Sequence, residues 1–305
     1  MIKKYLKFDF LYAKLLSEQT KKKTEALFVS IAIISFLLHL SIILLVDFEI
    51  IDLNSKSKLL NNPIASIYTP FSFILIYEVY LLVYYLPKST TIYIGKQYEI
   101  ITLIIIRRTF KDLTSLKFDK DWFSHQENIL FALDLAAILI LFYLIFIFYK
   151  LNTANEISKA VIQKSVEVTK FINFKRAVAV LLIPVFIIMS TYSLGHWIYE
   201  SLTITQIVKN IKDINKIFFD EFFTILILIE VLLLLVSLFL SDKFSRVIRN
   251  SGFIISTILI KLSFNTEGIL NTILIIVAVI FGVLIMKIHN KYELLEAKAV
   301  SKIEV

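Results

Sequence analysis

The sequence contains no cysteine, which excludes disulfides, cysteine-ligated zinc, iron–sulfur clusters and thiol catalysis together. Histidine is also scarce, and its four positions (His39, His125, His196 and His289) show no metal-binding spacing. The chain has only 5 glycines and 4 prolines, and no stretch is rich in either residue or in serine. These absences predict a protein with no metal, no cofactor and no flexible linker between domains.

Apolar residues are what the chain has in excess. They make up 58% of the sequence, against roughly 45–50% in soluble domains, and the mean hydropathy is +0.78. The net charge is +8, but lysine and arginine gather at the ends of apolar runs, which is typical of membrane topology signals. We therefore expect an integral membrane protein in contact with the lipid bilayer, and no binding to nucleic acid. The lysine- and isoleucine-rich composition favours a cell membrane of the bacterial inner-membrane type.

The apolar runs predict an all-α integral membrane protein with eight transmembrane helices and both termini in the cytoplasm. The predicted spans are 26–46, 67–86, 97–116, 127–149, 177–198, 222–240, 251–264 and 269–288. The third and seventh spans have apolar cores of only about ten residues each, so the count falls to six if neither crosses. Outside the spans we expect a surface helix at 1–25, a cytoplasmic linker helix at 151–176 and a charged tail at 290–305. The helical character of the tail leaves a homo-oligomer or another membrane partner open.

The two halves of the chain resemble each other in order, which predicts duplication of a four-helix unit over 26–150 and 177–289. The paired segments are YEVYLLVYYL with IEVLLLLVSL, EIITLIIIRRTF with FIISTILIKLSF, and ENILFALDLAAILIL with EGILNTILIIVAVIF. Because four is an even number of spans, both repeats have the same orientation. Their pseudo-symmetry axis is therefore expected along the membrane normal.

Ionisable residues within the predicted spans are the candidate functional residues, because a charge inside the bilayer needs a partner or a function. Glu78 and Arg107 lie roughly 12 and 15 Å above the inner ends of their spans, at 1.5 Å per residue. Glu230 and Lys261 lie at roughly 15 and 13 Å by the same estimate. We predict two ion pairs, one in each repeat. Such a pair either fixes how the helices pack or belongs to a pathway for protons or cations, and the sequence leaves both open.

Further polar residues make the first repeat the more charged of the two. Arg108 and Asp134 add charges at positions where the second repeat has Leu262 and Leu274. His39, in the first span, is either a hydrogen-bonded packing residue or a proton relay. The first repeat is therefore the better candidate for a pathway.

Charged residues also recur at set places in each half: the end of the first span, the middle of the second, the loop after it and the start of the third. In the first half these are Asp47, Glu78, Lys88 with Lys96, and Glu99; in the second they are Glu200, Glu230 and Arg246 with Arg249, with Phe253 in place of the last acid. In this pattern each half resembles the voltage-sensor bundle of the ion-transport superfamily. The resemblance implies a four-helix bundle with both ends inside. The fourth spans lack the arginine or lysine at every third position that such gating uses, so we expect the bundle shape without the gating.

The sequence thus predicts an ion channel or transporter that passes protons or a small monovalent cation through the first repeat. The residues assigned to this pathway are Asp47, Glu78, Glu99, Arg107 and Asp134. The alternative is a non-conducting scaffold or sensor subunit that acts through its cytoplasmic helices and their partners. We do not expect an enzyme, because general acid–base catalysis usually needs more convergent polar groups than these.

Overall fold

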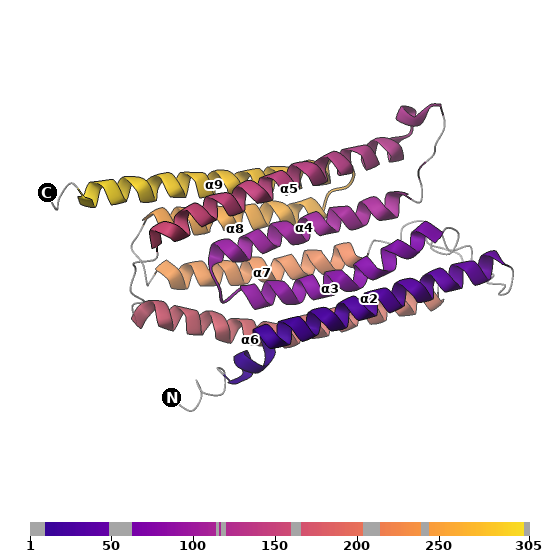
Figure 1. Ribbon diagram of the computed structural model, residues 1–305, viewed down its shortest axis with the longest axis horizontal. Helices are drawn as coiled ribbons and strands as arrows, with labels where there is room; N and C mark the ends of the chain where they lie inside the picture. The colour runs from indigo at the N-terminus through magenta and orange to yellow at the C-terminus, as the bar shows by residue number, and fades with distance from the viewer. Residues whose placement is uncertain are drawn as a thin grey trace. The chain divides into compact units, whose positions relative to one another are not determined.

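The computed structural model describes residues 10–48, 63–113, 116, 120–159, 166–203, 214–238 and 244–301 (Figure 1). The long helices are α2 (Glu18–Asp47), α3 (Tyr68–Tyr85), α4 (Thr90–Asp112), α5 (Gln126–Lys159), α6 (Val166–Thr203), α7 (Ile214–Leu238), α8 (Phe244–Phe264) and α9 (Ile269–Ser301). Two short 3₁₀ helices, η1 (Pro63–Ile67) and η3 (Trp122–Ser124), precede α3 and α5. The described residues contain no strand, so the all-α prediction is confirmed for them.

Six helices in the described part of the chain are long and apolar enough to cross a membrane. The segments are Phe10–Asp47, Gln126–Thr153, Thr169–Tyr192, Glu221–Leu238, Phe244–Phe264 and Ile269–Glu296. The apolar part of α3, Thr69–Tyr85, is shorter. α4 is not among the six, and it carries several charges, including Lys96, Glu99 and Arg107. The chain therefore has the helices of a multi-pass membrane protein, while the count of eight spans stays a prediction.

The described residues of 151–176 belong to two helices, because α5 continues to Lys159 and α6 begins at Val166. A separate cytoplasmic linker helix stays a prediction. α9 extends to Ser301, so the described part of the predicted tail is helical. Outside the described part lie residues 1–9 of the predicted surface helix, 160–165 of the linker, 302–305 of the tail, and the side chain of Glu200.

Local sequence signals account for the start of α2 and the turn between α8 and α9. Ser17 caps α2, because its hydroxyl oxygen accepts a hydrogen bond of 3.1 Å from the backbone N–H of Thr20. Gly268 lies in the turn after α8 with a φ of 62°, a left-handed conformation that glycine adopts without steric cost. This short turn lets α8 and α9 run antiparallel, side by side (Figure 1).

Packing divides the chain into two compact units. The first comprises Met1–Tyr84, Thr102–Ile138 and Ala179–Phe218, and the second comprises Tyr85–Ile101, Leu139–Val178 and Phe219–Val305. The helices α4, α5 and α6 each contribute one segment to each unit. Because this division follows packing and not sequence similarity, the two four-helix repeats stay a prediction.

The core of the second unit is built around Tyr98 of α4. Its ring lies 5.2 Å from that of Phe148 on α5, which in turn lies 5.8 Å from Phe253 on α8. The Tyr98 hydroxyl is 2.8 Å from the hydroxyl oxygen of Ser256. Gly282 of α9 lies against the same Tyr98 hydroxyl, and an added Cβ there would overlap it. These contacts fix the rotation of α4, on which the candidate site depends.

Candidate functional site

A buried carboxyl group on α7 is the centre of the candidate site. Glu230 is 7% exposed, and its Oε1 accepts a hydrogen bond from Nε2 of Gln97 on α4. The Oε1 of Gln97 in turn accepts a hydrogen bond of 2.8 Å from the hydroxyl of Thr257 on α8. Gln97 and Thr257 are fully buried. Three helices of the second unit are thus joined by one line of hydrogen bonds that ends on a carboxyl group.

The second oxygen of this carboxyl group accepts no hydrogen bond from the residues that the structure describes. Glu230 Oε2 and the hydroxyl of Tyr93 are both buried without a hydrogen-bond partner among the described residues. Tyr93 lies one turn before Gln97 on α4, and its hydroxyl is near the Glu230 carboxyl group. A buried carboxyl oxygen without a partner is costly in an apolar interior. A proton, a water molecule or a cation at this oxygen would remove that cost.

A cavity of about 30 Å³ lies beside Glu230 within the second unit. Its polar lining residues are Thr90, Tyr93, Lys175, Glu230 and Asn250. Phe171, Leu233 and Phe253 are among the apolar residues that complete the wall. Since a water molecule needs roughly 10–15 Å³ by this measure, the cavity has room for one or two waters or a small ion.

Lys175 of α6 is the second charged residue in the lining of this cavity. It is 5% exposed, and its Nζ donates to the backbone oxygen of Lys88 at 3.2 Å and to the hydroxyl of Thr90 at 3.4 Å. Both acceptors are neutral, and no carboxyl group of the described residues forms an ion pair with Lys175. Lys88 and Ser89 are exposed in the turn between α3 and α4. The Lys175 side of the cavity therefore lies next to an exposed turn.

The ion pair predicted between Glu230 and Lys261 is not formed among the described residues. Gln97 is the hydrogen-bond partner of Glu230, and Phe253 and Ile254 of α8 line the cavity beside it. Lys261 lies one turn beyond Thr257, whose hydroxyl donates to this same Gln97. The prediction paired charges by their depth, whereas a neutral amide takes the position next to Glu230.

In the first unit, Arg108 and Asp134 bind each other. The Nε and Nη2 of Arg108 each donate to one carboxyl oxygen of Asp134 at 2.6 Å, and Asp134 is 4% exposed. The sequence singled out both residues but did not pair them. Arg107 is buried on α4 and Glu78 is half-buried on α3, and their pairing stays a prediction. Asp47 is exposed at the last residue of α2.

Two further predicted residues have local partners. Glu99 belongs to the second unit, where it accepts hydrogen bonds from Nζ of Lys96 at 2.5 Å and from the hydroxyl of Tyr149 at 2.6 Å. His39 belongs to the first unit, where its Nδ1 lies 2.5 Å from the hydroxyl oxygen of Thr69. The residues that the sequence assigned to one pathway are therefore divided between the two units.

Sequence reasoning missed Tyr93, Gln97 and Lys175. A signal existed for the first two, because residues four apart on a helix lie on one face and both are polar groups in an apolar stretch. Lys175 could not be distinguished from the other basic residues of 151–176, which the sequence indicated as topology signals.

The described residues hold no group of three or more histidine, aspartate and glutamate side chains that could bind a metal ion. No protein-family model matches the chain, and neither a curated protein nor a solved structure is significantly similar to it.

Proposed function

We propose that this protein passes protons or a small cation across the membrane and that Glu230 binds the transported species. The observation that carries the proposal is the second oxygen of Glu230, a cavity-lining residue. This oxygen is buried without a hydrogen-bond partner in the described part of the chain. Ionisable residues inside membrane-spanning helices are rare, and they mark ion pathways, proton relays, voltage sensors or counter-ions of a ligand. The sequence predicted this pathway among the charges of the first repeat, whereas Glu230 belongs to the second unit.

The size and charge of the site define what it can bind. A cavity of about 30 Å³ is of the size that holds a few waters or a small ion. A carboxyl group binds a proton or a cation and repels an anion. Lys175 lines the same cavity and repels metal cations, whereas its amine can itself give and accept a proton. Protons are therefore the favoured species.

The proposed route leads from the exposed turn at Lys88 and Ser89, past Lys175, to Glu230. Lys175 donates to the backbone oxygen of Lys88, so it lies between the turn and the cavity. The basic residues at this end of the helices favour a cytoplasmic position for the turn, as the positive-inside rule predicts. The cavity would then connect Glu230 with the cytoplasm.

The test is proton flux into liposomes that contain the purified full chain and a pH-sensitive dye, driven by a pH difference. We expect wild-type flux above that of empty liposomes. Glu230→Gln keeps the size of the side chain and the acceptor for Gln97 but removes the ionisable group, so its flux should fall to the empty-liposome rate. Glu267→Gln is the matched control, because Glu267 is exposed and its flux should stay at the wild-type rate. Background flux in the wild type, or undiminished flux in Glu230→Gln, would contradict the proposal.

A second candidate function is a non-conducting scaffold or sensor subunit. It is favoured by Leu294 and Leu295 near the end of α9, which are 60% and 64% exposed. Two adjacent exposed leucines are a contact site for a membrane partner or for lipid. If the wild type carries no flux and Leu294→Ser with Leu295→Ser loses a co-purifying membrane protein, the scaffold function replaces the first.

A further inference from the structure

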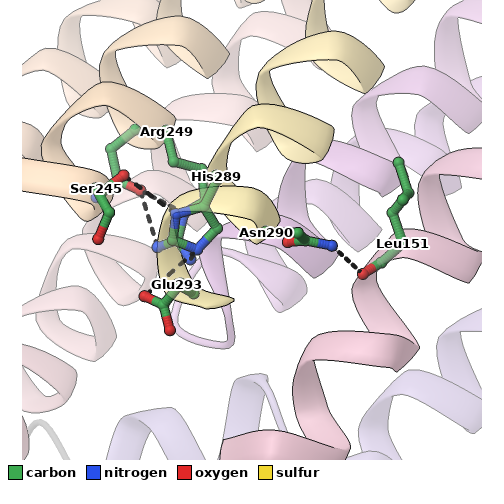
Figure 2. Close-up of polar contacts among 7 residues, drawn as sticks. Leu151, Ser245, Arg249, His289, Asn290 and Glu293 are labelled. Carbon is green, nitrogen blue, oxygen red and sulfur yellow. Dashed lines mark hydrogen bonds and ion pairs between the residues drawn. The ribbon is translucent and has the colours of Figure 1, made fainter. Parts of the chain in front are cut away.

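The hydrogen bonds of Arg249 on α8 go to neutral groups. Figure 2 shows Arg249 beside His289 of α9. Its Nε and Nη2 donate to the side-chain oxygen of Asn250 at 3.2 and 3.1 Å, and its Nη1 lies 3.2 Å from Nε2 of His289. The Nδ1 of His289 lies 3.2 Å from the backbone oxygen of Ser245, to which it can only donate. The Nε2 of a neutral His289 is then the acceptor for Arg249. None of these partners balances the charge of the guanidinium group.

An acid of α9, Glu293, lies near Arg249. Glu293 lies beside His289 in Figure 2, with its Oε1 3.8 Å from Nε2 of that ring. Its charge reaches Arg249, but the two side chains do not form an ion pair. Arg249 therefore has no carboxyl group within ion-pair distance among the described residues.

Lys175 is a second cation in this part of the second unit, and it is buried where Arg249 is half-buried. The two charges repel each other, and the hydrogen bonds of Lys175 also go to neutral oxygens. Asn250, which holds the guanidinium group, lines the same cavity as Lys175. Arg246, one turn before Arg249, adds to the positive field. Like charges that lie near each other in a partly buried site destabilise a fold unless an anion compensates them.

We propose that Lys175 and Arg249 bind a phosphate group, carried by a lipid headgroup or by a free phosphate anion, beside Asn250. A guanidinium group has five N–H donors and an ammonium group has three. Three donors of Arg249 and two of Lys175 are engaged, which leaves two and one for a ligand among the described contacts. Arg249 is half-buried, so a phosphate can reach it.

The chemistry of the site selects phosphate over other anions. Arginine binds two oxygens of one phosphate side by side, and a lysine ammonium group adds a point charge to a third. Basic pockets between membrane helices on the cytoplasmic side are a recurring form of site for anionic lipid headgroups. The site shares Lys175 with the proposed proton route, but it uses none of the contacts of Glu230, and its test measures binding and not flux.

The test measures the Tm of the purified full chain with two probes. In detergent, inorganic phosphate is titrated against sodium chloride of equal ionic strength. In nanodiscs, phosphatidylcholine is compared with a phosphatidylcholine–phosphatidylglycerol mixture. We expect a concentration-dependent rise of the wild-type Tm that Lys175→Met and Arg249→Gln abolish. Lys291→Gln is the matched control, because it removes the same charge from an exposed lysine and should respond as the wild type does.

The two probes distinguish the sources of the phosphate group. A response to phosphatidylglycerol alone identifies a lipid headgroup, and a response to inorganic phosphate identifies a free anion; either supports the site. In chloride alone, Lys175→Met should be at least as stable as the wild type, because it removes a buried cation. The Tm in chloride therefore distinguishes a variant that has lost phosphate binding from one that folds poorly. If Lys175→Met does not fold, Arg249→Gln alone is used for the comparison with the wild type. The proposal would be overturned if the wild type showed no response, or if both variants responded as strongly as the wild type.

Discussion

Gln97 forms hydrogen bonds with two other buried side chains of the second unit, one on each of two neighbouring helices. Its amide nitrogen donates to Glu230 and its amide oxygen accepts from Thr257, so it satisfies an acid and a hydroxyl at the same time. A glutamate could not donate to Glu230 unless it were protonated, and a lysine could not accept from Thr257. An amide is therefore the residue type that fits between these two neighbours.

Replacing Gln97 with leucine should cost about 2–4 kcal/mol of unfolding free energy, because it leaves a buried carboxyl group without its donor. Thr257→Val should cost only about 1 kcal/mol, because the hydrogen bond between Gln97 and Glu230 is kept. Both values can be measured by denaturant unfolding of the detergent-solubilised protein. Equal costs for the two variants would show that Glu230 does not need the amide.

For single residues, the sequence reveals which side chains carry charge but not which of them are paired. Arg108 and Asp134 could be recognised as candidates because each lies in an apolar stretch. Their pairing could not, because it depends on how α4 and α5 rotate against each other in the first unit. The partner of Glu230 was missed for the same reason: Gln97 is uncharged, and a search for ion pairs passes over it.

At the scale of whole elements, the helix ends were predictable where a turn residue sets them. α8 ends at Phe264 and α9 begins at Ile269, as the sequence predicted, and Gly268 lies between them. α4 begins at Thr90 and not at the predicted 97, which is about two turns earlier. The segment Pro87–Thr90 contains proline and serine, residue types that favour helix starts. The predicted span was placed by its apolar residues alone and therefore began later.

The close contact between α4 and α9 supplies a prediction at this scale. Gly282→Ala should destabilise the protein by about 1–3 kcal/mol, because its Cβ overlaps the hydroxyl of Tyr98. Adding Tyr98→Phe removes that hydroxyl, so the double variant should lose less stability than the sum of the two single variants. Leu284→Ala, on an exposed part of α9, is the control and should have a much smaller effect. Additive losses in a double-mutant cycle of Tyr98 and Gly282 would contradict the contact.

At the scale of the whole molecule, composition was sufficient for the fold class. An apolar fraction of 58% with basic residues at the ends of the runs predicts a helical membrane protein. It does not fix the number of spans, because α4 mixes isoleucines with lysine, arginine and glutamate. Whether such a helix crosses the bilayer depends on the neighbours that satisfy its charges, and those neighbours are set by packing.

Because the chain has no cysteine, single introduced cysteines can show whether α4 crosses the membrane. Ser89 and Ser124 are exposed before and after α4, so each can be replaced by a single cysteine. If α4 crosses the membrane, a membrane-impermeant maleimide should label only one of the two variants in intact spheroplasts, and both after lysis. Labelling of both or of neither in intact cells would place the two ends of α4 on the same side and favour six spans.

The short glycine turn between α8 and α9 has a consequence for how the chain reaches the bilayer. α8 carries Ser256, Thr257 and Lys261 and is the least hydropathic of the six candidate spans, whereas α9 is the most hydropathic. Because only a few residues join them, a translocon that releases one segment into lipid must accommodate the other almost at once. During biogenesis α9 would therefore draw its more polar neighbour into the membrane, and the two would enter as a single hairpin.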